Sequence, residues 1–235
     1  MGLPGHRVDC SGSHRAGSTM HARIADTTEA QRAHRRSTPE EIRPTLRSMA
    51  RALILTGGRG AGKTTLCLAL AALSHRYRGL LSPRIYTVTG NPVGSSARCL
   101  ATGAEWVLCR SDIELDGPRF GRFSFSSAGI ARAVDCLRGI LAASPEGGED
   151  DPRARPDIAR PVVIVDEIGP LELELGAGLA PVLPLLAGAG HLLLVARPSL
   201  ASRVEALLPG HERALMVVTP ENRASLASRI DAWFD

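Results

Sequence analysis

From residue 50 onward, short apolar runs alternate with longer segments whose apolar positions recur at helical spacing. The runs are rich in Leu, Ile and Val, which is typical of strands buried on both faces of a sheet. They predict strands at 52–56, 162–165, 191–196 and 214–218. The intervening segments predict helices at 64–73, 128–143, 178–189, 200–208 and 221–233. Strands and helices therefore alternate along the chain.

This alternation predicts an α/β fold in which a mostly parallel sheet is covered by helices on both faces. In such a sheet, ligands bind at the carboxyl ends of the strands. Residues 97–110 fit a β-hairpin instead, and we expect it as an addition at the sheet's edge. Residues 49–235 are numerous enough to bury a complete core of this kind.

Two stretches lack the pattern. Residues 1–48 contain eight arginines and five acidic residues without amphipathic spacing, which predicts a disordered basic N-terminal extension. Met49 stands just before the first strand, so this extension is either dispensable or an upstream extension of the reading frame. If a protein that begins at Met49 failed to fold or lost turnover, both alternatives would be excluded. Residues 144–160 combine Pro, Gly and charge, which predicts a flexible surface loop within the domain at 49–235.

The first predicted strand leads into a complete phosphate-binding motif, the Walker A sequence G-x-x-x-x-G-K-[ST]. Of the 28 Lys and Arg residues, Lys63 is the only lysine, and it stands where a compact ammonium can reach the β- and γ-phosphates. The loop's N–H groups and the N-terminus of the next helix favour anions. The predicted nucleotide-binding residues are Gly57, Gly58, Arg59, Gly60, Ala61, Gly62, Lys63, Thr64 and Thr65.

A second buried strand ends in two acidic residues, as a Walker B strand does. Four β-branched residues precede Asp166 and Glu167. Asp166 is positioned to hold Mg²⁺, to which Thr64 offers its hydroxyl. Glu167 is placed to polarise water for attack on the γ-phosphate, so Lys63 and Glu167 are the predicted catalytic residues. Together the motifs predict a P-loop NTPase with magnesium as its cofactor.

The run Asp-Glu-Ile-Gly-Pro-Leu-Glu-Leu at 166–173, together with Gly-Lys-Thr-Thr-Leu at 62–66, resembles a family of small nucleoside-triphosphatases. This family was first described in thermophiles and has a cancer-related human member. Segments 79–83, 99–105 and 218–223 are similar to further parts of it, so the resemblance covers about residues 50–235. The chain departs from the family at Arg59, where proline is frequent, and at Pro83-Arg84, where acids are frequent.

The resemblance implies an enzyme that hydrolyses ATP, GTP and other nucleoside triphosphates to the diphosphate and phosphate, with loose base selectivity. The chain agrees in one respect. A guanine-reading N-K-x-D motif needs a lysine, and the only lysine, Lys63, belongs to the phosphate loop.

Two other functions stay open. A small-molecule or nucleotide P-loop kinase would steer an acceptor hydroxyl with Asp166 or Glu167 and bind the acceptor at the hairpin. Arg153 and Arg155 could then close over the phosphates as a lid. A nucleotide-dependent switch or adaptor would hydrolyse slowly in the service of a partner. Phosphate on an acceptor would favour the kinase, and strong stimulation by a partner would favour the switch.

Several side chains have alternative roles. Arg59, Arg197 and Arg223 are candidates for an arginine finger that stabilises transition-state charge, and Arg59 could equally be a solvated loop residue. Glu172 either orients the loop or caps the helix that follows. Asn222 and Arg223 are expected near the base.

Charge and aromatic content argue against a nucleic-acid binder. The formal net charge of +4 comes mostly from residues 1–48, so the domain itself is nearly neutral. Phe120, Phe123 and Phe125 fit a core strand segment better than a base-stacking platform.

The five cysteines show no C-x-x-C pairing, which argues against a disulfide framework or a zinc site. Cys67, Cys99, Cys109 and Cys136 lie in apolar patterns and are expected to be buried. The apolar runs are too short to span a membrane and no signal peptide is visible. We therefore expect a cytoplasmic protein that binds nucleoside triphosphates but neither nucleic acid nor membrane. The sequence identifies no protein partner.

Overall fold

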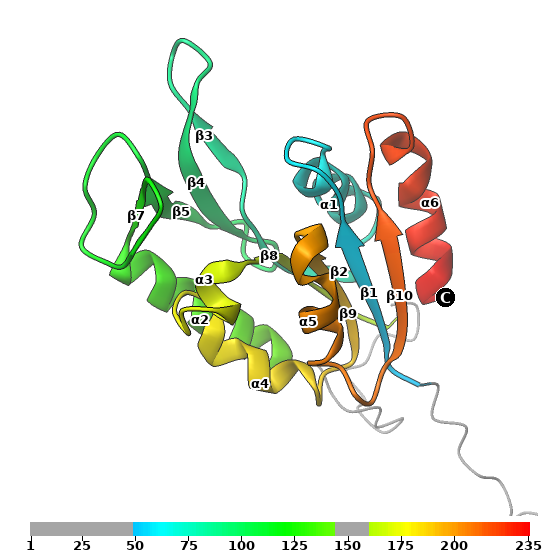
Figure 1. Cartoon of the computed structure of the whole chain (residues 1–235). Coiled ribbons are helices and arrows are strands. Elements are labelled where there is room, and N and C mark those ends of the chain that lie inside the picture. Colours follow the sequence, from blue (N-terminus) through cyan, green and yellow to red (C-terminus); the bar gives the residue numbers. More distant parts are fainter. Residues whose placement is uncertain (1–48, 144–159) are drawn as a thin grey trace, which may run out of the picture. The chain divides into compact units, whose positions relative to one another are not determined.

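One mixed β-sheet organises the chain in a computed structural model, which describes residues 49–143 and 160–235 (Figure 1). The strand order is β10-β1-β9-β8-β2-β4-β5-β7-β6, and β3 pairs with β4. The predicted extension at 1–48 lies outside the described residues, as does the predicted loop except for residue 160.

Five parallel strands form the half of the sheet that carries the phosphate loop. They are β1 (Arg51–Thr56), β2 (Tyr77–Leu81), β8 (Val162–Ile168), β9 (His191–Ala196) and β10 (Glu212–Val217). β1 lies between β10 and β9, and β9 separates β1 from β8. Because all five strands run in the same direction, their carboxyl ends meet at one edge of the sheet, as the alternating pattern predicts.

Antiparallel strands extend the sheet beyond β2. They are β3 (Arg84–Tyr86), β4 (Pro92–Cys99), β5 (Glu105–Arg110), β6 (Arg119–Phe120) and β7 (Phe123–Phe125). The predicted edge hairpin is present as β4 and β5, but it belongs to a larger extension than the sequence indicated. This extension joins the parallel half through two register pairs, Leu80 with Cys99 and Leu81 with Arg98.

Helices cover both faces of the sheet (Figure 1). α1 (Lys63–Leu73) and α6 (Arg223–Phe234) pack on one face, whereas α2 (Ser127–Ala142), α4 (Leu183–Leu186) and α5 (Ala201–Glu205) pack on the other. β1 shows the division, since Leu53 and Leu55 face α1 while Ala52 and Ile54 face α5. Within the described ranges, no helix is long and apolar enough to cross a membrane.

Two predicted helices are shorter in the structure. The segment 178–189 forms only a 3₁₀ turn, η1 (Ala180–Val182), followed by α4. Pro181 and Pro184 lack N–H donors and fit only the first turn of a helix, so the segment divides into two short pieces. The segment 200–208 becomes η2 (Pro198–Leu200) and α5, which ends before Pro209 restricts the backbone of Leu208.

The three phenylalanines predicted as a core strand segment lie on strands, but they are only half-buried. Phe120 is in β6, and Phe123 and Phe125 are in β7. Among the described residues, these strands are the last two at the antiparallel end of the sheet, and β6 pairs with β7 alone. The Arg122 guanidinium lies 5.1 Å from the ring centroid of Phe123. Their place at the sheet's end, rather than between two layers, explains the partial burial.

Candidate active site

The loop between β1 and α1 has, at two key positions, a backbone conformation that residues other than glycine rarely adopt. Gly57 has a φ of 146°, and a Cβ there would lie 2.4 Å from the carbonyl oxygen of Val218. Gly62, the residue before α1, has a φ of 94°. These conformations bring the loop to the start of α1, where the N–H groups of the first turn and the helix dipole favour phosphate.

We expect Gly57→Ala to destabilise the protein by about 3 kcal/mol, because the new methyl group collides with the backbone and the φ value is strained. Gly58→Ala is the matched control, since a Cβ at Gly58 would meet no atom of residues 49–143 or 160–235 within 4 Å. Urea unfolding of both variants measures the difference. Equal unfolding midpoints for the two would contradict the assignment of Gly57 as a required glycine.

Lys63 lies across the phosphate loop. Its Nζ donates hydrogen bonds to the carbonyl oxygens of Gly57 at 2.8 Å and Gly58 at 3.1 Å. An ammonium has three donors, so one remains for a phosphate oxygen. The lysine side chain thus lies over the phosphate loop, where one of its donors can reach a bound phosphate.

Asp166 is buried at the end of β8, with 2% of its surface exposed. Its carboxylate accepts a hydrogen bond from the Ser82 amide at 3.3 Å. Burial raises the pKa of Asp166 to about 6, and the Thr64 hydroxyl, the Ser82 amide and Lys63 oppose the increase only in part. The predicted magnesium ligands Thr64 and Asp166 therefore lie close together, and both present only oxygen donors.

Ser82 is a site residue that the sequence did not indicate. It directly follows β2, and its hydroxyl also donates to the backbone oxygen of Asp166. Its position after a strand could have indicated it, because the carboxyl ends of neighbouring parallel strands lie at one edge of the sheet. That inference requires knowing that β2 lies beside β8, the strand of Asp166.

Glu167 is more exposed than Asp166 and faces a different partner. Its strand gains one residue relative to β9 at this point, since Asp166 pairs with Val195 and Ile168 with Ala196. Such an irregularity re-aims a side chain. The Glu167 carboxylate accepts from the Nε of Arg197 at 3.3 Å, in an ion pair that solvent reaches. Arg197, one of three candidate arginine fingers, therefore lies beside the predicted general base.

Glu172 both caps a helix and fastens the loop after β8. Its two carboxylate oxygens accept from the backbone N–H of Gly169 at 2.8 Å and of Leu179 at 3.3 Å. Gly169 precedes α3 (Pro170–Leu173), so the carboxylate holds the first turn of that helix. Burial raises the pKa of Glu172. The carboxylate thus caps the helix to which Glu172 itself belongs, instead of a helix that follows it, and it also fixes the segment next to Glu167.

The turn between β10 and α6 adjoins the phosphate loop. The Arg223 side chain lies against Gly62, where a Cβ would meet its Nη1 at 3.0 Å. The amide of Asn222 is engaged within the turn, because its oxygen accepts from the Thr219 N–H and its nitrogen donates to Val217. Of the two residues expected near the base, only Arg223 thus has a side chain free of the turn. Arg59 is exposed within the loop.

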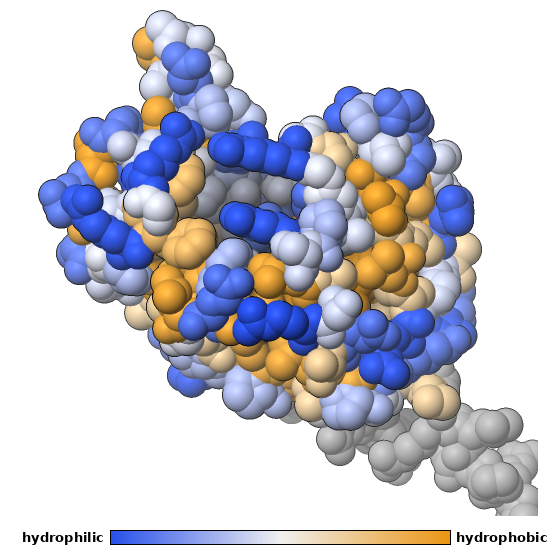
Figure 2. All heavy atoms as spheres, viewed as in Figure 1, coloured by the Kyte–Doolittle hydropathy of each residue, from blue (hydrophilic) through white to orange (hydrophobic). Residues whose placement is uncertain are grey.

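The surface beside these residues is hollowed. Figure 1 shows the β3–β4 hairpin rising on the same side of the sheet as the phosphate loop. In the space-filling view, hydrophilic residues border the hollow between the hairpin and the α1 side (Figure 2). The β3–β4 hairpin lies on one side of this hollow, and α1, which follows the phosphate loop, lies on the other (Figures 1 and 2).

Comparison with known proteins shows which family and which proteins this chain is similar to. A family model described as NTPase matches residues 52–231. The nucleoside-triphosphatase THEP1 of Methanopyrus kandleri is 31% identical over 129 residues, which are 53% of this chain and 61% of that protein. The chain thus matches somewhat less than two thirds of the length of this curated relative.

Two solved structures share the fold. THEP1 from the hyperthermophile Aquifex aeolicus superposes with a TM-score of 0.55 at 18% identity, over 78% of this chain and 99% of that one. A human cancer-related nucleoside triphosphatase gives a TM-score of 0.57 at 24% identity, over 78% and 97% of the two chains. At these identities the likeness concerns the fold alone.

Proposed function

Because the chain belongs to the NTPase family, whose model matches residues 52–231, we propose that it is a magnesium-dependent nucleoside triphosphatase. It would hydrolyse ATP, GTP and other nucleoside triphosphates to the diphosphate and phosphate. The observation that carries this proposal is that the buried carboxylate of Asp166 lies close to the start of α1, where Thr64 and Lys63 stand. α1 follows β1 and Asp166 lies in β8, and the fold brings the two segments to one edge although β9 separates their strands.

The phosphates would be held by the loop from Gly57 to Thr65. Backbone N–H groups bind the phosphate oxygens, and Lys63 reaches the β- and γ-phosphates with its free donor. Thr64 and Asp166 would hold Mg²⁺, because a hydroxyl and a carboxylate are the hard oxygen donors that this ion prefers. Magnesium bound there would neutralise charge on the phosphates.

Glu167 would position and deprotonate the attacking water. Its carboxylate is half-exposed at the same strand end as Asp166, so a water molecule can reach it. Arg197 holds this carboxylate at 3.3 Å and places a positive charge at the edge of the site. A guanidinium in this position would orient the base and would stabilise negative charge that develops nearby in the transition state.

Loose base selectivity fits the residues beside the loop. The Arg223 guanidinium lies against Gly62, and a planar guanidinium can stack on the face of any base. The Asn222 amide, which could have read a base edge, is used within its turn. Stacking without edge recognition gives binding that differs little between purines and pyrimidines.

Phosphate release from ATP, GTP, CTP and UTP tests the proposal. We expect turnover with all four in the presence of magnesium, without any acceptor, and its loss when EDTA removes the ion. Tight nucleotide binding without phosphate release would reject hydrolysis. Transfer of phosphate to an acceptor would instead support a kinase, for which the antiparallel strands across the hollow could form the acceptor site.

A further inference from the structure

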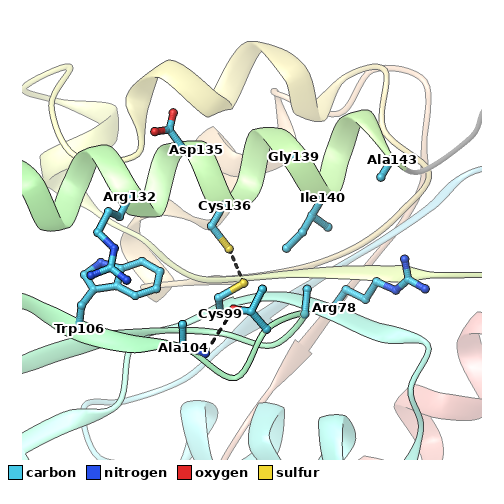
Figure 3. Close-up of a pocket in the computed structure, with 12 residues that line it drawn as sticks. Arg78, Cys99, Ala104, Trp106, Arg132, Asp135, Cys136, Gly139, Ile140 and Ala143 are labelled. Atoms are coloured by element: carbon cyan, nitrogen blue, oxygen red, sulfur yellow. Dashed lines mark hydrogen bonds between the residues drawn. The ribbon is translucent and has the colours of Figure 1, made fainter.

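Two cysteines from separate elements meet on the α2 face of the sheet. Cys99 is the last residue of β4, and Cys136 lies in α2. Their sulfur atoms are 2.7 Å apart and point toward each other (Figure 3). Cys99 belongs to the apolar cluster of the α2 face, whereas Ala61 of the phosphate loop belongs to the cluster of the α1 face. The pair is therefore separate from the proposed active site.

The two thiols differ in acidity. Burial tends to raise the pKa of Cys99, but hydrogen bonds from Cys136, from Thr102 and from the Ala101 backbone lower it below the ordinary value. The pKa of Cys136 is raised to about 12 by burial and by its hydrogen bond to Cys99. Cys136 therefore retains its proton and donates it toward Cys99, which is the sulfur that more readily becomes a thiolate nucleophile.

A cavity gives small molecules access to the pair. Both cysteines line a space of about 500 Å³ between α2 and the β4–β5 hairpin, together with Trp106 and Arg132 (Figure 3). The Arg132 guanidinium packs 4.6 Å from the centroid of the Trp106 ring at the cavity wall. Cys99 itself is only 4% exposed, so a small oxidant would reach it more easily than a bulky one. Cys67 is fully buried, and burial raises the pKa of its thiol.

We propose that Cys99 and Cys136 are a site of reversible oxidation by hydroperoxides, with Cys99 as the attacking thiol and Cys136 as the resolving thiol. The Cys99 thiolate attacks one peroxide oxygen and the O–O bond breaks. The departing oxygen takes a proton and leaves as an alcohol, or as water when the oxidant is hydrogen peroxide. Cys99 becomes a sulfenic acid.

The second step closes the disulfide. The sulfur of Cys136 gives up its proton and attacks the Cys99 sulfur, and the hydroxyl of the sulfenic acid takes that proton and leaves as water. Two thiols are thus oxidised to one disulfide while the hydroperoxide is reduced to an alcohol and water. A thiol reductant reverses the change.

The bond would tie α2 to the end of β4 and close a long loop in the unfolded chain. A cross-link of this kind stabilises a protein by restricting its unfolded state. We therefore expect the melting temperature of the oxidised protein to exceed that of the reduced protein by about 5 to 15 °C.

The test treats the full-length chain with hydrogen peroxide, alkylates the remaining thiols and maps disulfide-linked peptides by mass spectrometry. We expect the wild type to lose the mass of two hydrogens, to link Cys99 to Cys136 and to recover with dithiothreitol. Cys109→Ala is the matched control and should behave in the same way, since Cys109 lies in β5 against Ser95. Melting curves with and without reductant accompany the mapping.

Two variants separate the roles of the thiols. Cys136→Ala should accumulate a sulfenic acid on Cys99 that dimedone traps, whereas Cys99→Ala should leave Cys136 unreacted. Oxidation of Cys136 in Cys99→Ala would overturn the assignment of the attacking thiol. Any other end state in the wild type, such as a bond to Cys10 or two free thiols after treatment, would overturn the proposal itself. None of these readouts depends on nucleotide hydrolysis.

Discussion

Glu167→Gln is expected to lower the rate of phosphate release by about 10²- to 10⁴-fold while nucleotide affinity stays unchanged. Glutamine has the same shape and can still accept a hydrogen bond from Arg197, but it cannot take a proton from water. The phosphate loop and Asp166 are left as they are, so the nucleotide still binds. Single-turnover phosphate release together with an equilibrium nucleotide titration separates the two effects.

Glu174→Gln is the appropriate control for this variant. Glu174 is a nearby exposed acid that pairs with Arg203 at 3.6 Å, apart from the strand ends. It should keep the wild-type rate. If Glu167→Gln retained a rate close to that of Glu174→Gln, another group would have to activate the water and the proposed role of Glu167 would be wrong.

Asp166→Asn should abolish magnesium-dependent turnover and also stabilise the nucleotide-free protein at neutral pH. Burial raises the pKa of Asp166 from 3.8 to about 6, so the folded state binds this proton more tightly than the unfolded state. The stability that this group contributes is complete below the unfolded pKa of 3.8 and is lost as the pH rises through about 6. Above that pH, the charged carboxylate costs up to about 3 kcal/mol, a cost that asparagine avoids.

Urea unfolding from pH 4 to pH 8, without nucleotide or magnesium, measures this effect. The free energy of unfolding of Asp166→Asn should exceed that of the wild type by an amount that grows between about pH 4 and pH 6 and then stays constant. Asp135→Asn, an exposed substitution on α2, should not alter the pH dependence. A difference that did not vary with pH would show that burial of the Asp166 charge is not its cause.

The sequence predicts which residue types make up the candidate site, but it predicts only part of how these residues are arranged in space. The phosphate loop and the strand ending in Asp166 are continuous in sequence, and each carries its own local signal. Alternation of strands and helices then places both at one edge of a parallel sheet. That edge is where the structure puts Lys63, Thr64 and Asp166.

Contacts between segments distant in sequence could not be predicted in this way. The position of β9 between β1 and β8 depends on packing of the whole sheet, and it brings Arg197 to Glu167. The contact of Ser82 with Asp166 likewise depends on which strand lies beside β8. The segment 178–189 has a helical pattern of apolar residues, but its prolines limit it to short turns. Local periodicity identifies elements, and the neighbours of each element depend on the complete fold.

The narrow join between the two halves of the sheet has a consequence for how such proteins can diversify. The antiparallel strands meet the parallel half through two register pairs of β2 and β4. None of the residues proposed to hold phosphate or magnesium lies on the antiparallel strands. Insertions, deletions or exchanges in the antiparallel strands would therefore leave the edge with the phosphate loop and Asp166 intact while reshaping the β3–β4 side of the hollow. Evolution could change what enters the proposed site, or which molecule docks beside it, without having to rebuild the residues proposed to carry out hydrolysis.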